Sequence, residues 1–188
     1  MSRISVTNPA PLDYAIAANA LTVGQETYPR LVCQTSFAMS TGSLRLAFFT
    51  AHKTETSTQA RVIAATGYSG GAPTLIRFGL FSIDGSGNLS LIASTPNDTT
   101  LLAAAQQYSK AWSASIGVVL GTRYAFGALV VTSGTAPTLT GINLQNGAEA
   151  ATDPRMTGIL AGQADLPSSI AVGSLGNSGI GPYAAITP

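Results

Sequence analysis

Residues 71–95, GAPTLIRFGLFSIDGSGNLSLIAST, contain two apolar segments that are separated by a short polar stretch rich in glycine. The segments Thr74–Ile83 and Asn88–Thr95 are rich in Leu, Ile and Phe, which is typical of strands. Between them, Asp84–Asn88 supplies the Asp, Gly and Asn residues that tolerate the positive φ angles of a tight turn. This stretch therefore predicts a β-hairpin.

Segments of the same kind occur along the rest of the chain and are separated by clusters of Gly, Pro, Asn, Asp and Ser. They are LRLAFFT (44–50), TQARVIAAT (58–66), YSKAWSASI (108–116) and TRYAFGALVVT (122–132). Many short strands at this spacing predict an all-β protein, and we expect a jelly-roll-like antiparallel β-sandwich. In the last segment both alternating faces are mostly apolar, which predicts a central strand.

We expect one sandwich domain, residues 31–188, behind a short extended N-terminal arm, residues 1–30. Pro9, Pro11 and Pro29 interrupt regular structure in the arm. Helical character is limited to Thr99–Gln107, where Asp98 is a candidate N-cap and a turn or two is expected. After Thr132 the chain is predicted to be mostly loop, because Pro and Gly recur between short apolar runs.

The composition is poor in charge, with 9% charged residues and a formal net charge of +1. Soluble globular proteins carry roughly 25%, so this surface favours a protein held in a permanent assembly. Lys53 and Lys110 are the only lysines and the arginines are scattered, which argues against nucleic acid as a partner.

No run approaches the about 20 apolar residues of a membrane span, so no membrane insertion is expected. A secretory signal is also disfavoured. Cys33 is the only cysteine and forms no internal disulfide; we interpret it as a small apolar residue.

One catalytic motif has to be considered. GYSGG (67–71) matches the G-x-S-x-G nucleophile elbow with Ser69 as the nucleophile, but an elbow is followed by a helix and this motif is followed by a predicted strand. A triad would also need His52, the only histidine, and a carboxylate such as Asp84 or Asp98. The eight acidic residues are dispersed, which weakly opposes the paired carboxylates of glycoside hydrolysis. We therefore predict no enzyme and no catalytic residue.

Metal and ligand sites are also weakly indicated. Asp84, Ser86 and Asn88 have the alternate spacing of a calcium loop, but Thr95 occupies the position where a bidentate Glu is required. His52 has only Glu55 nearby as a further zinc ligand. We predict no metal and no cofactor, and assign no binding residue. Three aromatic residues remain as candidates for sugar stacking if exposed, although core or interface positions are the more ordinary case; they are Tyr68, Tyr108 and Trp112.

Several segments together resemble a β-sandwich module found in virion structural proteins, notably minor tail proteins, of tailed phages that infect actinobacteria. The most specific are FFTAHKTET (48–56) and LFSIDGSGNLSLIASTPNDTTL (80–101). The likeness extends over residues 29–188 and includes RYAFGALVV, GQADLPSSI and the closing PYAAITP. In that family the module usually ends a longer protein, whereas here it follows only a short arm. The resemblance implies a building or adhesion block and supplies no catalytic residue.

The expected function is that of a non-enzymatic phage virion protein, either a minor tail protein or a capsid decoration protein. It would be made in the host cytoplasm, form a homotrimer through apolar interfaces and contact other virion proteins at the particle surface. The N-terminal arm, with its apolar run Tyr14–Val23, is expected to cross onto another subunit or onto the particle. The alternative is a receptor-binding module of a tail fibre, whose loops Gly67–Gly71 and Asp84–Asn88 would bind a host cell-surface glycan.

Overall fold

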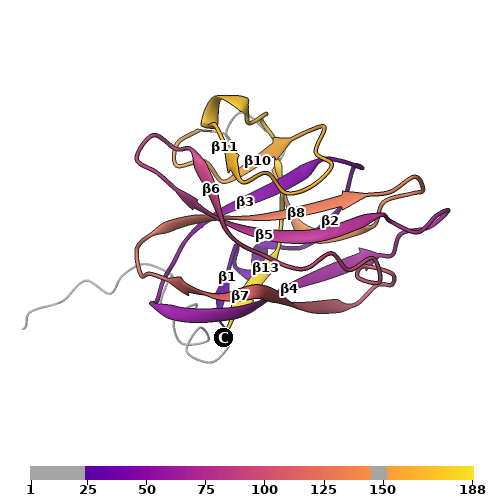
Figure 1. The fold of residues 1–188 in the computed structure, drawn as a ribbon, viewed down its shortest axis with the longest axis horizontal. Helices are drawn as coiled ribbons and strands as arrows, with labels where there is room; N and C mark the ends of the chain where they lie inside the picture. The colour runs from indigo at the N-terminus through magenta and orange to yellow at the C-terminus, as the bar shows by residue number, and fades with distance from the viewer. Residues whose placement is uncertain (1–23, 145–151) are drawn as a thin grey trace, which may run out of the picture.

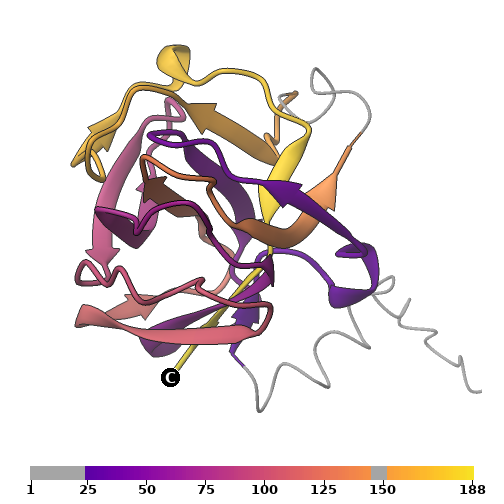
Figure 2. The ribbon, with the colours of Figure 1, turned by 90° about the vertical axis from the view of Figure 1, so that its right-hand side faces the viewer.

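The computed structural model describes residues 24–144 and 152–188, which form two antiparallel sheets packed face to face (Figures 1 and 2). The seven-stranded sheet contains β1 (Gln25–Glu26), β2 (Thr35–Ala38), β4 (Glu55–Thr66), β7 (Gln107–Val118), β9 (Thr138–Asn143), β12 (Ile180–Pro182) and β13 (Ala184–Thr187). The six-stranded sheet contains β3 (Leu44–Thr50), β5 (Leu75–Ile83), β6 (Leu89–Ser94), β8 (Arg123–Val131), β10 (Thr157–Leu160) and β11 (Ser169–Ile170). The prediction of an all-β sandwich is confirmed, while its jelly-roll connectivity stays a prediction.

The six strands expected between residues 44 and 132 are all present. The opening stretch forms the β5–β6 hairpin, in which Asp84 N–H donates to Asn88 O and Gly87 has a φ of +83°. β8 lies between β3 and β5, so its predicted central position is confirmed. The positive φ at Gly87 is the conformation for which the Asp- and Gly-rich turn was assigned.

The two faces of β8 explain why its sequence is apolar throughout. Tyr124, Phe126, Ala128 and Val130 point into the inner core, which lies between the two sheets. Ala125 and Leu129 point the other way, into an outer core that also contains Leu44, Leu46, Phe48, Phe81, Leu89, Leu166, Ile170 and Leu175. The six-stranded sheet is therefore buried on both faces.

The outer core is covered by the strap, which we define as residues 161–176 between β10 and β12. It includes β11 and the short 3₁₀ helix η2 (Val172–Ser174), and in Figure 1 it lies above the six-stranded sheet. Gly79 and Gly127 face each other on β5 and β8 beneath it. A Cβ atom at Gly79 would lie 3.2 Å from Leu166 Cδ1 and 2.9 Å from Leu91 Cδ1, so the glycines make room for the side chains of the outer core.

Three predictions about local structure need correction. No helix forms in Thr99–Gln107: Leu101 N–H donates to Asp98 O, but Leu102 has a φ of +61° and the turn does not continue. The chain after Thr132 contains loops, as predicted, but also five short strands that were not expected, because β9 to β13 form there by pairing with earlier strands. Regular structure also begins before the domain boundary expected at residue 31, at β1.

Part of the predicted arm lies outside the described residues, and its last residues belong to the sandwich. β1 pairs antiparallel with β13, and Gln25 and Thr27 are buried. Tyr28 is also buried, and its hydroxyl donates to Met156 O. η1 (Arg30–Val32) follows at once. Residues 24–28 are therefore anchored to the C-terminal strand, whereas the expected crossing of Tyr14–Val23 concerns residues that the structure does not describe.

Candidate functional site

Ser69 sits in a connection between two strands and not at the start of a helix. Its backbone exchanges two hydrogen bonds with Thr135, with N···O distances of 3.1 and 2.7 Å, and β5 follows. A Cβ atom at Gly134 would lie 2.4 Å from Ser69 O, so glycine allows the two loops to approach backbone to backbone. GYSGG is therefore followed by a strand, as predicted, and forms a glycine-rich connection.

His52 lies at the other end of the sandwich from Ser69. It follows β3, whose last residue Thr50 pairs with Arg123 at the start of β8. Ser69 is bound to Thr135, beyond the end of β8 at Val131. The length of β8, at about 3.3 Å per residue, separates these two ends by roughly 25 Å. Ser69 and His52 are therefore not brought together.

The two candidate carboxylates, Asp84 and Asp98, also lie at opposite ends of the sandwich. Asp84 follows β5 at the end where Ser82 pairs with Tyr124, which is the His52 end. Asp98 N–H donates to Ile76 O near the start of β5, which is the Ser69 end. The arrangement brings neither a Ser–His pair nor a triad together from these residues.

Both carboxylate oxygens of Asp84 accept hydrogen bonds from its own turn. Its Oδ1 accepts the backbone N–H groups of Ser86 and Asn88, each at 2.8 Å, and its Oδ2 accepts the Asn88 amide. The hydrogen bonds from Asn88 hold the pKa of this carboxyl below its usual range. Thr95, the failed twelfth calcium position, is buried with its hydroxyl accepting Phe78 N–H. The stretch acts as a hydrogen-bonded turn.

Other metal-ligating residues are equally dispersed across residues 24–144 and 152–188. No group of three or more His, Cys, Asp or Glu side chains gathers in this part of the chain. Glu55, the neighbour of His52 in sequence, forms an ion pair with Lys53 at 2.8 Å. The described residues also contain no helix that is long and apolar enough to span a membrane.

The three candidate sugar-stacking aromatics all contact the inner core. Trp112 is 5% exposed and donates its Nε1–H to Ser57 Oγ at 2.9 Å. The hydroxyl of Tyr68 donates to Thr99 O, and that of Tyr108 contacts the backbone of Ala104. Their rings and polar atoms are thus engaged in packing the sandwich.

Cys33 is half-buried and unpaired by any disulfide. Burial, and to a lesser extent the negative charge of Glu26, raises the pKa of its thiol to about 11. The thiol is therefore protonated near neutral pH and is a poor nucleophile. This agrees with its interpretation as a small apolar residue.

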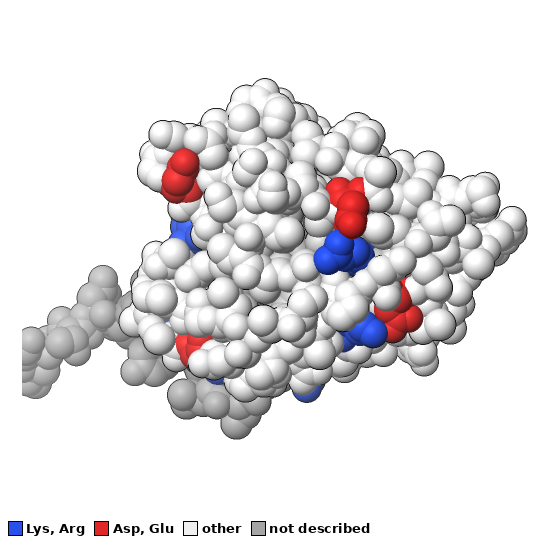
Figure 3. All heavy atoms as spheres, in the orientation of Figure 1, with Lys and Arg blue, Asp and Glu red and all other residues white. Residues whose placement is uncertain are grey.

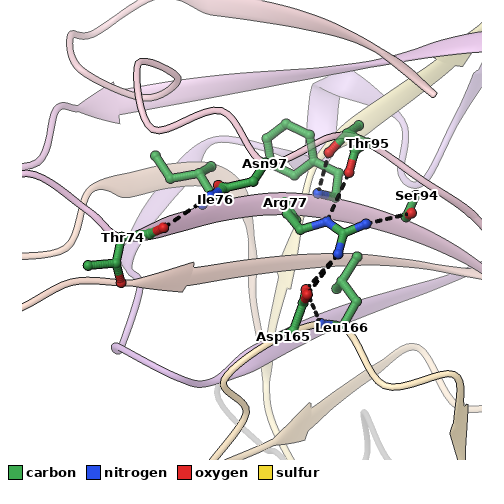
Figure 4. Close-up of polar contacts among 9 residues, drawn as sticks. Thr74, Ile76, Arg77, Ser94, Thr95, Asn97, Asp165 and Leu166 are labelled. Carbon is green, nitrogen blue, oxygen red and sulfur yellow. Dashed lines mark hydrogen bonds and ion pairs between the residues drawn. The ribbon is translucent and has the colours of Figure 1, made fainter. Parts of the chain in front are cut away.

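The sequence reasoning missed a polar cluster around Arg77, which holds the strap (Figure 4). Arg77 Nη1 lies 2.8 and 2.9 Å from the two carboxylate oxygens of Asp165 in the strap. Its Nε donates to Thr95 O, and its Nη2 donates to Ser94 Oγ. Asp165 Oδ1 also accepts the backbone N–H of Leu166. No local signal predicts this contact, because the two residues are separated by 88 positions.

The residues after β6 also form long-range polar contacts, and these hold the start of β5. Asn97 Oδ1 accepts Ile76 N–H, and its amide donates to Thr74 O (Figure 4). Asp98 accepts the N–H and hydroxyl of Thr100 and forms an ion pair with Lys110 at 2.6 Å. Asp84, Thr95 and Asn97 of the stretch SIDGSGNLSLIASTPNDTT therefore accept backbone N–H groups, and Asp98 binds Thr100 and Lys110.

Comparison with known proteins adds no further assignment. No protein-family model matches the chain, and no curated protein matches it. The resemblance to the phage virion module consequently rests on the sequence motifs quoted above. The geometry provides a sandwich in which Asp84, Thr95 and Asn97 of the quoted motifs accept backbone N–H groups.

Proposed function

We propose that the protein is a non-enzymatic structural protein of a bacteriophage virion, of the minor tail or capsid decoration type. It assembles as a homotrimer on the particle surface, contacts other virion proteins and needs no cofactor. In this role the protein binds its neighbours through apolar surface and catalyses no reaction.

The observation that carries this proposal is the role of the motifs behind the resemblance. Thr54, in FFTAHKTET, accepts the backbone N–H of Leu120 through its hydroxyl at 3.0 Å. Asp84, Thr95 and Asn97, in the hairpin motif, accept backbone N–H groups. Side chains that are consumed in fixing the backbone support a structural role for these motifs, because they are not available for substrate chemistry.

The surface supports an assembled state. On the face shown in Figure 3, acidic and basic side chains occupy only a few separate spots. Among the described residues, the most exposed large apolar side chains are Leu31 (84%) with Val32 in η1, and Leu120 (61%) with Val119 in the turn before β8; Met156 and Val172 are also exposed. The second turn is rigid, since Gly121 N–H donates to Ala51 O and Thr122 N–H donates to Val119 O. Exposed apolar groups on fixed backbone favour protein contacts.

Locating the protein in virus particles tests the proposal. Antibodies raised against the folded chain are applied to purified particles of the phage that encodes it, and the label is imaged by electron microscopy. We expect regular labelling of the capsid surface or of the tail, together with the protein in the mass spectrum of washed particles. Its absence from intact particles, while it is abundant in the infected cell, would contradict the proposal.

The receptor-binding alternative receives less support, because the three candidate aromatics pack against the inner core. A glycan screen with the purified protein separates the two functions. Binding to a defined host glycan that is lost on changing Tyr68 or Tyr108 would favour the alternative. Particle labelling without glycan binding supports the structural role.

A further inference from the structure

β7 is an edge strand of unusual length for this molecule. Among residues 24–144 and 152–188 it pairs with β4 alone, and it runs over twelve residues. The other strands at sheet edges, β1, β2, β10, β11 and β12, have four residues or fewer. Natural sandwiches protect their edges by keeping edge strands short, and β7 departs from that pattern.

The direction of the free hydrogen-bonding groups follows from the pairing with β4. Ala64 N–H donates to Gln106 O at 3.0 Å, and the register then matches Val62 with Tyr108 and Ala60 with Lys110. Since hydrogen bonding alternates along an antiparallel pair, residues 106, 108 and 110 turn their backbone groups toward β4. Gln107, Ser109 and Ala111 therefore turn theirs toward the open edge.

Two common protective devices, proline and outward charge, are not used in residues 107–111. Residues 107–111 contain no proline, and Gln107, Ser109 and Ala111 are exposed, small or uncharged side chains. The single charge, Lys110, shares the face of Ala60 toward the core and is held by Asp98 at 2.6 Å. Charge on an edge strand normally repels a second strand, and here it is directed away from the edge.

We propose that the edge of β7 binds β7 of a second copy of this chain, antiparallel and about a two-fold axis at Ser109. Identical strands related by a two-fold are antiparallel by symmetry. This register places Ser109 opposite Ser109 of the partner subunit and Gln107 opposite the partner's Ala111, so the outward groups of both copies meet. Each such pair exchanges two backbone hydrogen bonds.

A second copy fits this edge because no like charges meet in that register. Lys110 lies opposite the partner's Tyr108, and both copies keep their ammonium groups toward Asp98. The register of β7 against β4 is broken between Ala111 and Ile116, which limits the regular pairing segment to Gln107–Ala111. The contact joins copies in pairs and does not depend on the proposed function: it holds for free chains and for members of neighbouring trimers.

The first test replaces Ser109 in the full chain. Ser109→Pro removes the outward N–H of the central pair without removing a bond to β4, and proline is tolerated at such edge positions. Ser109→Thr keeps that N–H and is the matched control. Sedimentation velocity over a range of concentrations should show pairwise association in the wild type and in Ser109→Thr, weakened roughly ten-fold or more in Ser109→Pro. Circular dichroism checks the fold of each variant.

A second pair of variants answers the question even if proline disrupts the strand. Ser109→Lys places two like charges opposite each other and should weaken association most at low salt. Ser113→Lys adds the same charge to an exposed residue in the irregular part of β7 and should leave association unchanged.

Three results would overturn the proposal. They are a wild type that stays monomeric at the highest soluble concentration, a Ser109→Lys variant that associates as tightly as Ser113→Lys, and an association lost on removing residues 1–23 but indifferent to Ser109. Association that survives removal of residues 1–23 and responds to Ser109→Lys supports it.

Discussion

β7 and β8 are consecutive strands joined by the turn Val119–Thr122, yet they occupy opposite environments. β8 pairs on both sides, and from Tyr124 to Val130 every residue is buried. β7 pairs on one side, and only Trp112 and Val118 are buried. One strand thus lies between the inner and the outer core, and the next strand along the chain forms an exposed edge of the other sheet.

The difference shows where the stability of this sandwich comes from. The six-stranded sheet has the inner core on one face and the outer core, closed by the strap, on the other. Apolar burial is the dominant favourable term in folding, so this sheet and its strap are expected to dominate the free energy of unfolding. β7 contributes its inward side chains, while its outer edge pairs with no strand among residues 24–144 and 152–188.

The largest predicted effect separates the two strands directly. Phe126 is fully buried, and its ring lies 5.8 Å from that of Phe78, centroid to centroid. Phe126→Ala should lower the free energy of unfolding by about 3–5 kcal/mol because it leaves a cavity in the inner core. Ser113→Ala on β7 should change it by less than about 0.5 kcal/mol. Urea unfolding followed by circular dichroism measures both, and equal effects would remove the distinction between the strands.

The next effect uses the same substitution in both strands. A Cβ atom at Gly127 of β8 would lie 2.9 Å from Leu44 Cδ1 and 3.0 Å from Phe81 Cε2, whereas nothing lies within 4 Å of one at Gly117 of β7. Gly127→Ala should destabilise the protein by about 1–3 kcal/mol through overpacking of the outer core. Gly117→Ala should be neutral or slightly stabilising, because alanine restricts the unfolded chain. A neutral Gly127→Ala in thermal melts would mean that the outer core adapts more freely than its packing indicates.

The sequence reveals β8 more fully than β7 for a physical reason. A strand buried on both faces must be apolar at every position, and TRYAFGALVVT shows this directly. Whether a strand lies at the edge depends on the topology of the whole sheet, and the local sequence YSKAWSASI does not indicate this position. The strap was missed because its anchor is a contact between Arg77 and Asp165, which are far apart in the chain. The expected helix after Asp98 failed because the turn ends at Leu102.

A smaller effect concerns the anchor of the strap. Asp165→Ala removes the ion pair with Arg77 and the acceptor of Leu166 N–H. The carboxylate is partly exposed, so the global loss should be only about 1 kcal/mol. Locally, hydrogen exchange at Leu91 N–H, which donates to Ser168 O of the strap, should accelerate more than exchange within β8. Ser169→Ala, at an exposed strap residue, is the control, and unchanged exchange at Leu91 in Asp165→Ala would show that the outer core alone holds the strap.

The smallest effect is a pH dependence at the only charge of β7. Hydrogen bonds from Lys110 first, and then from Thr100, lower the pKa of Asp98 to about 2. A carboxyl whose pKa is lowered on folding adds stability above its ordinary value near 4, and this contribution disappears as the pH falls toward 2. Asp98→Asn should therefore cost less than about 1 kcal/mol at pH 7, with the difference from wild type shrinking between pH 4 and pH 2.

Lys110→Met provides the matched background for this measurement. In that background the main cause of the low pKa is gone, so Asp98→Asn should show a smaller pH dependence in urea midpoints taken from pH 2 to pH 7. An undiminished pH dependence without Lys110 would assign the effect to Thr100. In the wild type, Lys110 would then not be held by Asp98. Its charge would be available to repel a second strand, and the edge of β7 would not be unprotected.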